Sequence, residues 1–355
     1  MRKTFMTLIM FGLLSQVASA ADAPAVKFNG DFRLRNETIN QEGSVARNRD
    51  RIRVRAGLAA EVNSDVTAVV QLTTADNADA RSPNQTLTDA NSKKSIALDL
   101  AYVNWKVDST TQVTLGKMKQ PFTKSQSVFF DSDITPEGFA VIKTLPYDLY
   151  VNAFTFDLAE RSTATDARLN GLQLGTKKTV LGQNVTAAVG YFDHTGVEKT
   201  SVVQAGSAGG SFGNTTSGGI LTNDYNILDV VVNADSKVAN YPVAFSVEYA
   251  KNTKALNKSQ DTATAVGVTV GKASAPKSWE AGVLYQQVQK DALFAQWIDS
   301  DFGGGSTDSK GLVFRGTYVA AKNVKLSGTY YVNTINNSTT NIDYHRLMLD
   351  AAYSF

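Results

Sequence analysis

The sequence contains no cysteine among its 355 residues. This absence excludes disulfide bonds, cysteine-ligated zinc, iron–sulfur clusters and a cysteine nucleophile. Only two histidines are present, His194 and His345, which leaves little from which to build a histidine metal site or a catalytic triad. We therefore expect no metal, no cofactor and no catalytic residues, and we expect the protein not to be an enzyme.

Long apolar runs are missing after the N-terminus, where one short run occurs. The basic pair Arg2-Lys3 precedes an apolar stretch at 5–14, and Ala18-Ser19-Ala20 supplies the small residues that a signal peptidase requires. We predict a signal peptide at residues 1–20 and one folded domain at 21–355. No later run approaches the roughly 20 apolar residues of a membrane helix. We expect the mature protein to be exported without such a helix.

An excess of charge of either sign is also missing. Removal of residues 1–20 takes away two basic residues, so that Lys and Arg fall from 35 to 33 and equal the 33 Asp and Glu. A mature chain without net charge argues against binding nucleic acid through bulk positive charge. The hydrophobic content of 43% argues against intrinsic disorder.

The rest of the chain shows alternation of apolar and polar residues in segments of about ten residues. In the segment 324–333, for example, Val324, Leu326, Tyr330 and Val332 share one parity, and polar residues occupy much of the other. This pattern predicts β-strands with one apolar and one polar face. We predict sixteen strands, at residues 26–38, 47–62, 65–74, 95–107, 111–118, 138–145, 147–157, 167–179, 183–193, 223–235, 239–251, 262–272, 277–290, 309–320, 323–334 and 341–355.

Short and long connections alternate between these strands, and the long ones include 194–222 and 291–309. Such alternation is typical of an up-and-down meander. A soluble sandwich would bury the apolar face against a second sheet, whereas a closed barrel in lipid pairs every backbone group and leaves no edge. All seven prolines lie outside strand centres, as a fully paired sheet requires. The predicted fold class is therefore all-β: a transmembrane antiparallel up-and-down β-barrel of about 16 strands, with short periplasmic turns and long extracellular loops.

The end of the chain has a distinctive pattern. Residues 347–355 place apolar or aromatic side chains at the odd positions and end on Phe355. This resembles the terminal strand of bacterial outer-membrane proteins that the barrel-assembly machinery recognises, so Tyr353 and Phe355 are the predicted assembly signal. The last strand is expected to pair with the first. Aromatic residues near strand ends, Tyr102 and Tyr191 among them, are expected to form girdles at the membrane interfaces.

Five stretches carry a resemblance to a known family: 47–58 (RNRDRIRVRAGL), 82–87 (SPNQTL), 99–105 (DLAYVNW), 115–122 (LGKMKQPF) and 131–138 (DSDITPEG). They resemble a putative porin family of Gram-negative outer membranes, and the fourth is more distantly similar to phosphate-selective porins. The resemblance implies a channel for small hydrophilic solutes in the outer membrane, in contact with lipid and lipopolysaccharide. Analogy with sixteen-stranded porins implies a homotrimer, and no nucleic-acid partner is expected.

Arginines of one parity mark the second predicted strand, from Arg47 to Arg55. An arginine on the lipid face would cost up to ~2–4 kcal/mol near the midplane, so these side chains are expected to face the lumen. Two arginines of the preceding strand match this parity, and adjacent strands lie about 4.8 Å apart. The predicted pore-lining basic wall consists of Arg33, Arg35, Arg51, Arg53 and Arg55. The alternative is that lumen acids such as Asp31, Glu37 and Asp99 pair with it and neutralise it.

The connection from Lys119 to about Pro136 is the third long one, and the resemblance to porins implies that it folds into the barrel as a constriction. Its predicted constriction residues are Lys119, Lys124, Asp131, Asp133 and Glu137. Carboxylates that face an arginine wall would create a transverse field in which polar solutes align. The alternative is an ordinary extracellular loop whose Asp and Pro residues shape turns.

These features favour an outer-membrane porin for passive diffusion of small hydrophilic solutes and ions. Two alternatives stay open: a solute-specific channel, for example for anions such as phosphate, and a non-conducting adhesin or structural barrel that uses its long loops as contact surface. An outer-membrane hydrolase is disfavoured, since His345 with Asp343 or Asp350 is the only grouping that resembles an activating site.

Overall fold

The computed structural model describes residues 25–75, 79–88, 90–125, 129–202 and 210–355. The predicted signal peptide at 1–20 lies outside these residues. Within them, no helix has the length and apolar character needed to cross a membrane. The regular structure is almost entirely β, and the helical turns are η1 (Ala295–Trp297) and η2 (Phe302–Gly305).

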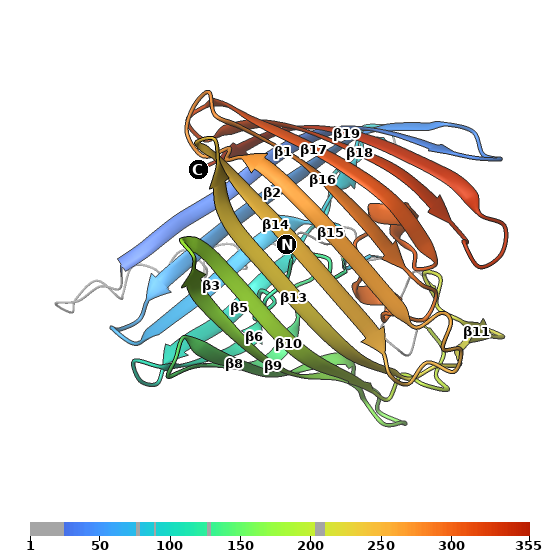
Figure 1. Cartoon of the computed structure of the whole chain (residues 1–355), viewed down its shortest axis with the longest axis horizontal. Helices are drawn as coiled ribbons and strands as arrows, with labels where there is room; N and C mark the ends of the chain where they lie inside the picture. Colours follow the sequence, from blue (N-terminus) through green and yellow to red (C-terminus); the bar gives the residue numbers. More distant parts are fainter. Residues whose placement is uncertain (1–24, 76–78, 89, 126–128, 203–209) are drawn as a thin grey trace, which may run out of the picture.

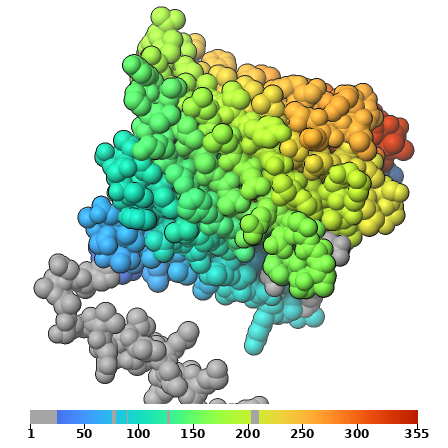
Figure 2. Space-filling view, turned by 90° about the horizontal axis from the view of Figure 1, so that it is seen from below, coloured from blue at the N-terminus to red at the C-terminus, as the bar shows by residue number. Residues whose placement is uncertain are grey.

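Sixteen long antiparallel strands close into one barrel (Figure 1), which confirms the predicted fold class. They are β1 (Ala25–Gln41), β2 (Arg47–Glu61), β3 (Val66–Thr74), β5 (Ile96–Lys106), β6 (Thr111–Lys117), β7 (Glu137–Leu145), β8 (Leu149–Ala159), β9 (Ala167–Val180), β10 (Gln183–Thr195), β13 (Tyr225–Val238), β14 (Tyr241–Asn252), β15 (Thr262–Gly271), β16 (Trp279–Val288), β17 (Ser309–Ala321), β18 (Val324–Ile335) and β19 (Ile342–Ser354). Each strand pairs with its neighbours in chain order. On the face that Figure 2 shows, the colours of successive parts of the chain follow one another across the wall.

Three further short strands lie in the long connections. The two-residue β4 (Gln85–Thr86) pairs with β2 beyond the end of β3. A small separate hairpin consists of β11 (Thr216–Ser217) and β12 (Ile220–Leu221). Several long connections therefore carry structure of their own.

Alternation along the strands gives the barrel an apolar exterior. In β19, Leu347 and Leu349 are exposed, whereas Arg346 and Met348, which alternate with them, are 3% exposed. In β3, Val70 and Leu72 are likewise exposed. A convex sheet face of exposed Leu and Val is what lipid contact requires.

The interior is apolar on one side. Inward-facing residues of β8 and β10, among them Phe154, Phe156 and Phe192, are buried in a cluster with residues from the long connections. Phe154 lies over Gly171 of β9, where a Cβ atom would come within 2.0 Å of its ring. The absence of a side chain at Gly171 thus lets the aromatic ring lie flat on the inner wall.

A bulge in β5 changes the face on which its residues lie. The pairing with β3 shifts register next to Gln71, and Asp99 and Leu100 are both buried. After this shift Val103 and Trp105 are the exposed residues. Tyr102 packs against the interior cluster, so its expected place in an interfacial girdle is wrong. The extra residue of the bulge reverses the parity that simple alternation extrapolates.

The last strand, β19, pairs with β1 and closes the barrel, as the sequence predicts, and Phe355 extends this seam. The backbone N–H of Phe355 donates to the carbonyl of Gly30 at 3.0 Å, and the N–H of Gly30 donates back at 2.9 Å. The Phe355 ring stacks on Phe28, with ring centroids 5.6 Å apart. A Cβ atom at Gly30 would lie 2.5 Å from the Phe355 ring and 2.4 Å from the Arg55 carbonyl oxygen. Glycine at this position therefore makes room for the terminal ring.

Substitution of Gly30→Val should weaken this seam, because the new side chain occupies the place of the Phe355 ring. We expect a loss of about 1–3 kcal/mol in the free energy of unfolding, as for other overpacked sites. Urea titration of the refolded barrel, with heat-modifiable gel mobility as a second readout, measures it. The matched control is Gly316→Val, since no atom lies within 4 Å of that Cβ position. Equal stability of the two variants would contradict the role of Gly30 in making room for the Phe355 ring.

Candidate functional site

The five predicted wall arginines lie on the inner face of β1 and β2. The strand register places Arg33 opposite Arg53, and Arg35 opposite Arg51. Like charges directly opposite each other destabilise a strand pair. The arrangement therefore requires carboxylates close to the guanidinium groups.

Carboxylates supply this compensation. Arg53 Nη2 lies 2.6 Å from Asp31 Oδ1, and Arg35 Nε lies 2.7 Å from Asp350 Oδ1. Arg55 lies 3.5 Å from Asp99 through Nε and 2.6 Å from Asp133 through Nη2. The structure therefore has the arrangement of the alternative prediction, in which carboxylates of the lumen pair with the arginines of the basic wall.

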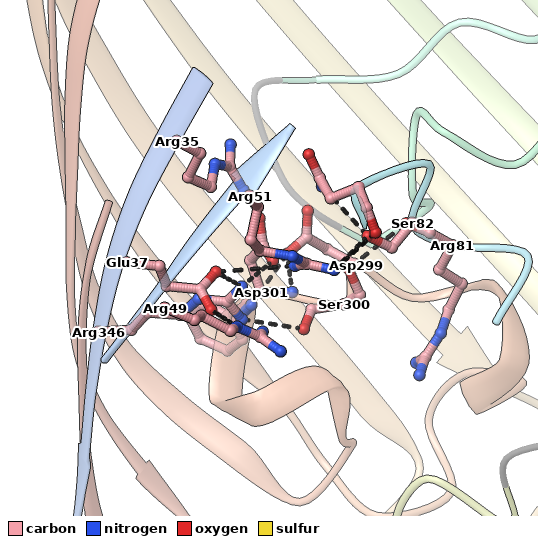
Figure 3. Close-up of polar contacts among 12 residues, drawn as sticks. Arg35, Glu37, Arg49, Arg51, Arg81, Ser82, Asp299, Ser300, Asp301 and Arg346 are labelled. Atoms are coloured by element: carbon pink, nitrogen blue, oxygen red, sulfur yellow. Dashed lines mark hydrogen bonds and ion pairs between the residues drawn. The ribbon is translucent and has the colours of Figure 1, made fainter. Parts of the chain in front are cut away.

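Glu37 of β1 is the centre of a second group of ion pairs (Figure 3). Its side chain is fully buried and accepts hydrogen bonds from Arg49 and from Arg346 of β19, and Arg51 Nη1 lies 3.8 Å away. Arg346 also lies 2.6 Å from Asp301 Oδ1. The group thus joins the two strands at the barrel seam to a connection that follows β16.

The third connection, residues 118–136 between β6 and β7, contacts inward-facing side chains of several strands. Thr123 and Gln173 of β9 exchange hydrogen bonds of 2.8 and 3.0 Å. Ser125 Oγ donates to Glu248 of β14 at 2.6 Å, and Asp133 reaches Arg55 of β2. These partners lie on both sides of the interior, so the connection crosses it.

The seventh connection, residues 289–308 between β16 and β17, was not part of the predicted site. Asp301 lies 3.2 Å from Arg35, and the backbone N–H of Ser300 donates to Asp131 of the third connection at 3.0 Å. The Arg81 guanidinium donates to the carbonyl of Gly305 at 2.8 Å. The apolar run at 292–295, buried in the structure, is the sequence signal that this connection packs inside.

Two carboxyl groups of the seventh connection have pKa values shifted in opposite directions. Burial, followed by the negative charge of Asp301, raises the pKa of Asp299 to about 6. Burial would raise the pKa of Asp301 as well, but the charges of Arg346 and Arg35 outweigh it and hold that pKa below its usual range. Asp301 therefore stays ionised and serves as a permanent counter-charge for the arginines.

A cavity of about 690 Å³ lies between the wall and the third connection, and we call it the wall cavity. Its lining includes Arg53, Arg55, Asp99, Lys119, Lys124 and Asp133. Glu137 is not brought to this place. It is the first residue of β7, is 64% exposed and pairs with Lys117 at 2.9 Å.

Asp131 is the remaining predicted residue of the connection. It is 4% exposed, and its backbone N–H donates to the Trp297 carbonyl at 2.8 Å. It therefore joins the third and seventh connections to each other.

At the C-terminus, Tyr353 of the predicted assembly signal packs beside Phe32, with ring centroids 6.2 Å apart.

Comparison with known proteins gives one family match. A family model described as putative porin matches residues 21–220 and 213–353. No curated protein sequence matches the chain.

Solved porin-type barrels have a similar fold. A high-pH structure of Pseudomonas putida OprB is 11% identical, with a TM-score of 0.63 over 93% of this chain and 94% of that one. Salmonella typhi OmpF in complex with daunomycin is 13% identical, with a TM-score of 0.56 over 95% and 99%. A loop L8 deletion mutant of Vibrio cholerae OmpT, an outer-membrane protein, is 15% identical, with a TM-score of 0.54 over 94% and 100%. At these identities the likeness concerns the fold.

Removal of the Arg346 charge should destabilise the barrel, because Glu37 and Asp301 would lose a buried partner. We expect Arg346→Met to lower the free energy of unfolding by about 3 kcal/mol, at the lower end of the cost of breaking a buried pair. The control is Arg168→Met, whose half-exposed side chain pairs with Asp157 and should contribute roughly 0–1 kcal/mol. Urea unfolding in phospholipid vesicles compares the two variants. Equal losses in the free energy of unfolding would contradict a stabilising role for the ion pairs of Arg346 with Glu37 and Asp301.

Proposed function

The chain belongs to the putative porin family of the outer membrane, and we propose that it forms a water-filled channel for passive diffusion of small hydrophilic solutes and ions. Membership in this family indicates a channel rather than an enzyme. The channel's narrowest part, in this proposal, is the wall cavity, bounded on one side by the basic wall and on the other by the third connection.

One observation carries the proposal. The wall cavity has strand residues of β1, β2, β3 and β5 on one side and residues of the third connection on the other, and the Arg55–Asp133 pair joins the two sides. A passage here has guanidinium groups on one wall and a carboxylate on the other. Fixed opposite charges across a narrow polar space favour polar solutes over apolar ones, which would have to displace ordered water.

The charges of the arginines of β1, β2 and β19 and of their carboxylate partners nearly balance. Seven arginines face six carboxylates: Arg33, Arg35, Arg49, Arg51, Arg53, Arg55 and Arg346 against Asp31, Glu37, Asp99, Asp133, Asp301 and Asp350. Among the described residues, Arg33 alone of these arginines has no carboxylate within ion-pair distance, and it donates to Asn84 instead. The proposed channel therefore has a weak preference for anions.

The partners of the channel are part of the same proposal. Cleavage after Ala20 would release the exported chain, and Tyr353 and Phe355 would present the terminal strand to the barrel-assembly machinery. Lipid and lipopolysaccharide would cover the apolar exterior. A homotrimer is proposed by analogy with Vibrio cholerae OmpT, one of whose structures is described as a trimer form.

Reversal potentials in planar bilayers under a KCl gradient test the proposal. Wild-type protein should give ohmic single-channel steps with a weak anion preference. Asp133→Asn should increase that preference a few-fold, because Arg55 loses one of its two carboxylates, and Arg33→Gln should reduce it.

Lys322→Gln is the control for these variants, because Lys322 is an exposed residue of the turn between β17 and β18. It should leave the reversal potential unchanged. A cation preference in wild-type protein would contradict the charge balance. A folded, heat-modifiable barrel without steps would favour an adhesin or structural barrel.

A further inference from the structure

The arginines that line the wall cavity are engaged with its carboxylates. Arg53 donates twice to Asp31, at 2.9 and 2.6 Å. Arg55 lies between Asp99 and Asp133. These arginines therefore have little charge left to attract a negatively charged solute.

Two lysines of the third connection also line the cavity, and their contacts differ. Lys124 Nζ donates to Gln120 Oε1 at 2.9 Å and to the Phe130 carbonyl at 3.4 Å, both neutral acceptors. Lys119 is exposed, and no ion pair or hydrogen bond of its ammonium group is found among the described residues. The available positive charge of the cavity is thus carried by lysines and not by the arginine wall.

The total charge of the lining limits the charge of a ligand. Four cationic side chains, Arg53, Arg55, Lys119 and Lys124, face the three carboxylates of Asp31, Asp99 and Asp133. Among the side chains of the lining, the surplus is one positive charge. A monoanion matches this surplus, whereas a second negative charge on the ligand would be repelled by the three carboxylates.

The neutral lining points to a ligand with hydroxyl groups. Asn29, Gln71, Ser132 and Thr135 also line the cavity, and amides and hydroxyls can both donate and accept hydrogen bonds. The Gln71 amide donates to Asp99 and leaves its oxygen as an acceptor, whereas Gln120 is occupied by Lys124 and by the carbonyls of Asp131 and Ile134. The volume of about 690 Å³ is within the range of small-molecule sites and far exceeds that of a small inorganic anion. A hydroxylated organic molecule would use both the space and the polar lining.

We propose that the wall cavity is a binding site for small hydroxylated monocarboxylates, such as sugar acids, with Lys119 and Lys124 attracting the carboxylate. This inference rests on the proposed function, because it assigns a solute class to the same channel. Lys119 and Lys124 are then the residues that determine specificity, and the paired arginines shape the site. The amide and hydroxyl groups of the lining bind the solute's hydroxyls.

Gluconate is the probe, and glucose is its neutral counterpart of similar size. Gluconate should interrupt single-channel current in a concentration-dependent manner and bind the refolded protein in detergent by calorimetry, with glucose at least tenfold weaker. Lys119→Gln and Lys124→Gln should each lower the affinity for gluconate about tenfold, which is the loss expected for a charge-assisted hydrogen bond. Lys322→Gln should have wild-type affinity.

The two readouts separate this inference from the proposed function. If channels conduct but gluconate and glucose act equally, or if both lysine variants bind gluconate as wild type does, the site is overturned and the porin stands. If inorganic phosphate binds more tightly than gluconate, the assigned solute class is wrong. If no channel forms and calorimetry detects no gluconate binding, the proposed channel and the proposed site are both wrong. If gluconate binds in calorimetry but no channel conducts, the site stands and the proposed channel is wrong.

Discussion

The interior of this barrel depends on one electrostatic constraint, which is the register of β1 and β2. It sets Arg33 against Arg53 and Arg35 against Arg51, inside a wall that water reaches only in part. Buried guanidinium groups in such an arrangement are tolerated only with carboxylates nearby. Strand residues supply some of these carboxylates, but Asp133 and Asp301 come from the third and seventh connections. The need for counter-charge thus helps to hold two long connections inside the barrel.

The apolar cluster supports the same connections from the opposite side. Phe122 and Phe130 of the third connection pack against Phe154 and Phe192 of the wall, with ring centroids 5.1 to 5.5 Å apart. Aromatic burial of this kind stabilises a segment more than exposed polar contacts do. The interior is therefore divided into an apolar anchoring side and a charged side. The wall cavity lies on the charged side, which is where a hydrated solute can move.

Much of the fold could be predicted from the sequence, because alternation with a period of two specifies both strands and faces. The parity of Arg51 to Arg55 likewise predicts their inward direction. Three features could not be predicted. The bulge at Asp99 depends on the pairing of β5 with β3, which no local pattern encodes. The contact of Asp301 with Arg35 joins residues 266 positions apart, in a connection without periodicity. Glu137 is acidic, as a residue of the predicted constriction would be, but it is the first residue of β7, where its side chain is exposed.

Substituted-cysteine accessibility measures whether solutes pass through the wall cavity, and the chain has no native cysteine that would also react. Gln71 lines the cavity, whereas its neighbour Leu72 is exposed on the outer face. A positively charged methanethiosulfonate reagent should lower the single-channel conductance of Gln71→Cys and leave that of Leu72→Cys unchanged. Unaltered conductance of Gln71→Cys, with modification proven by mass spectrometry, would show that ions do not pass through the wall cavity.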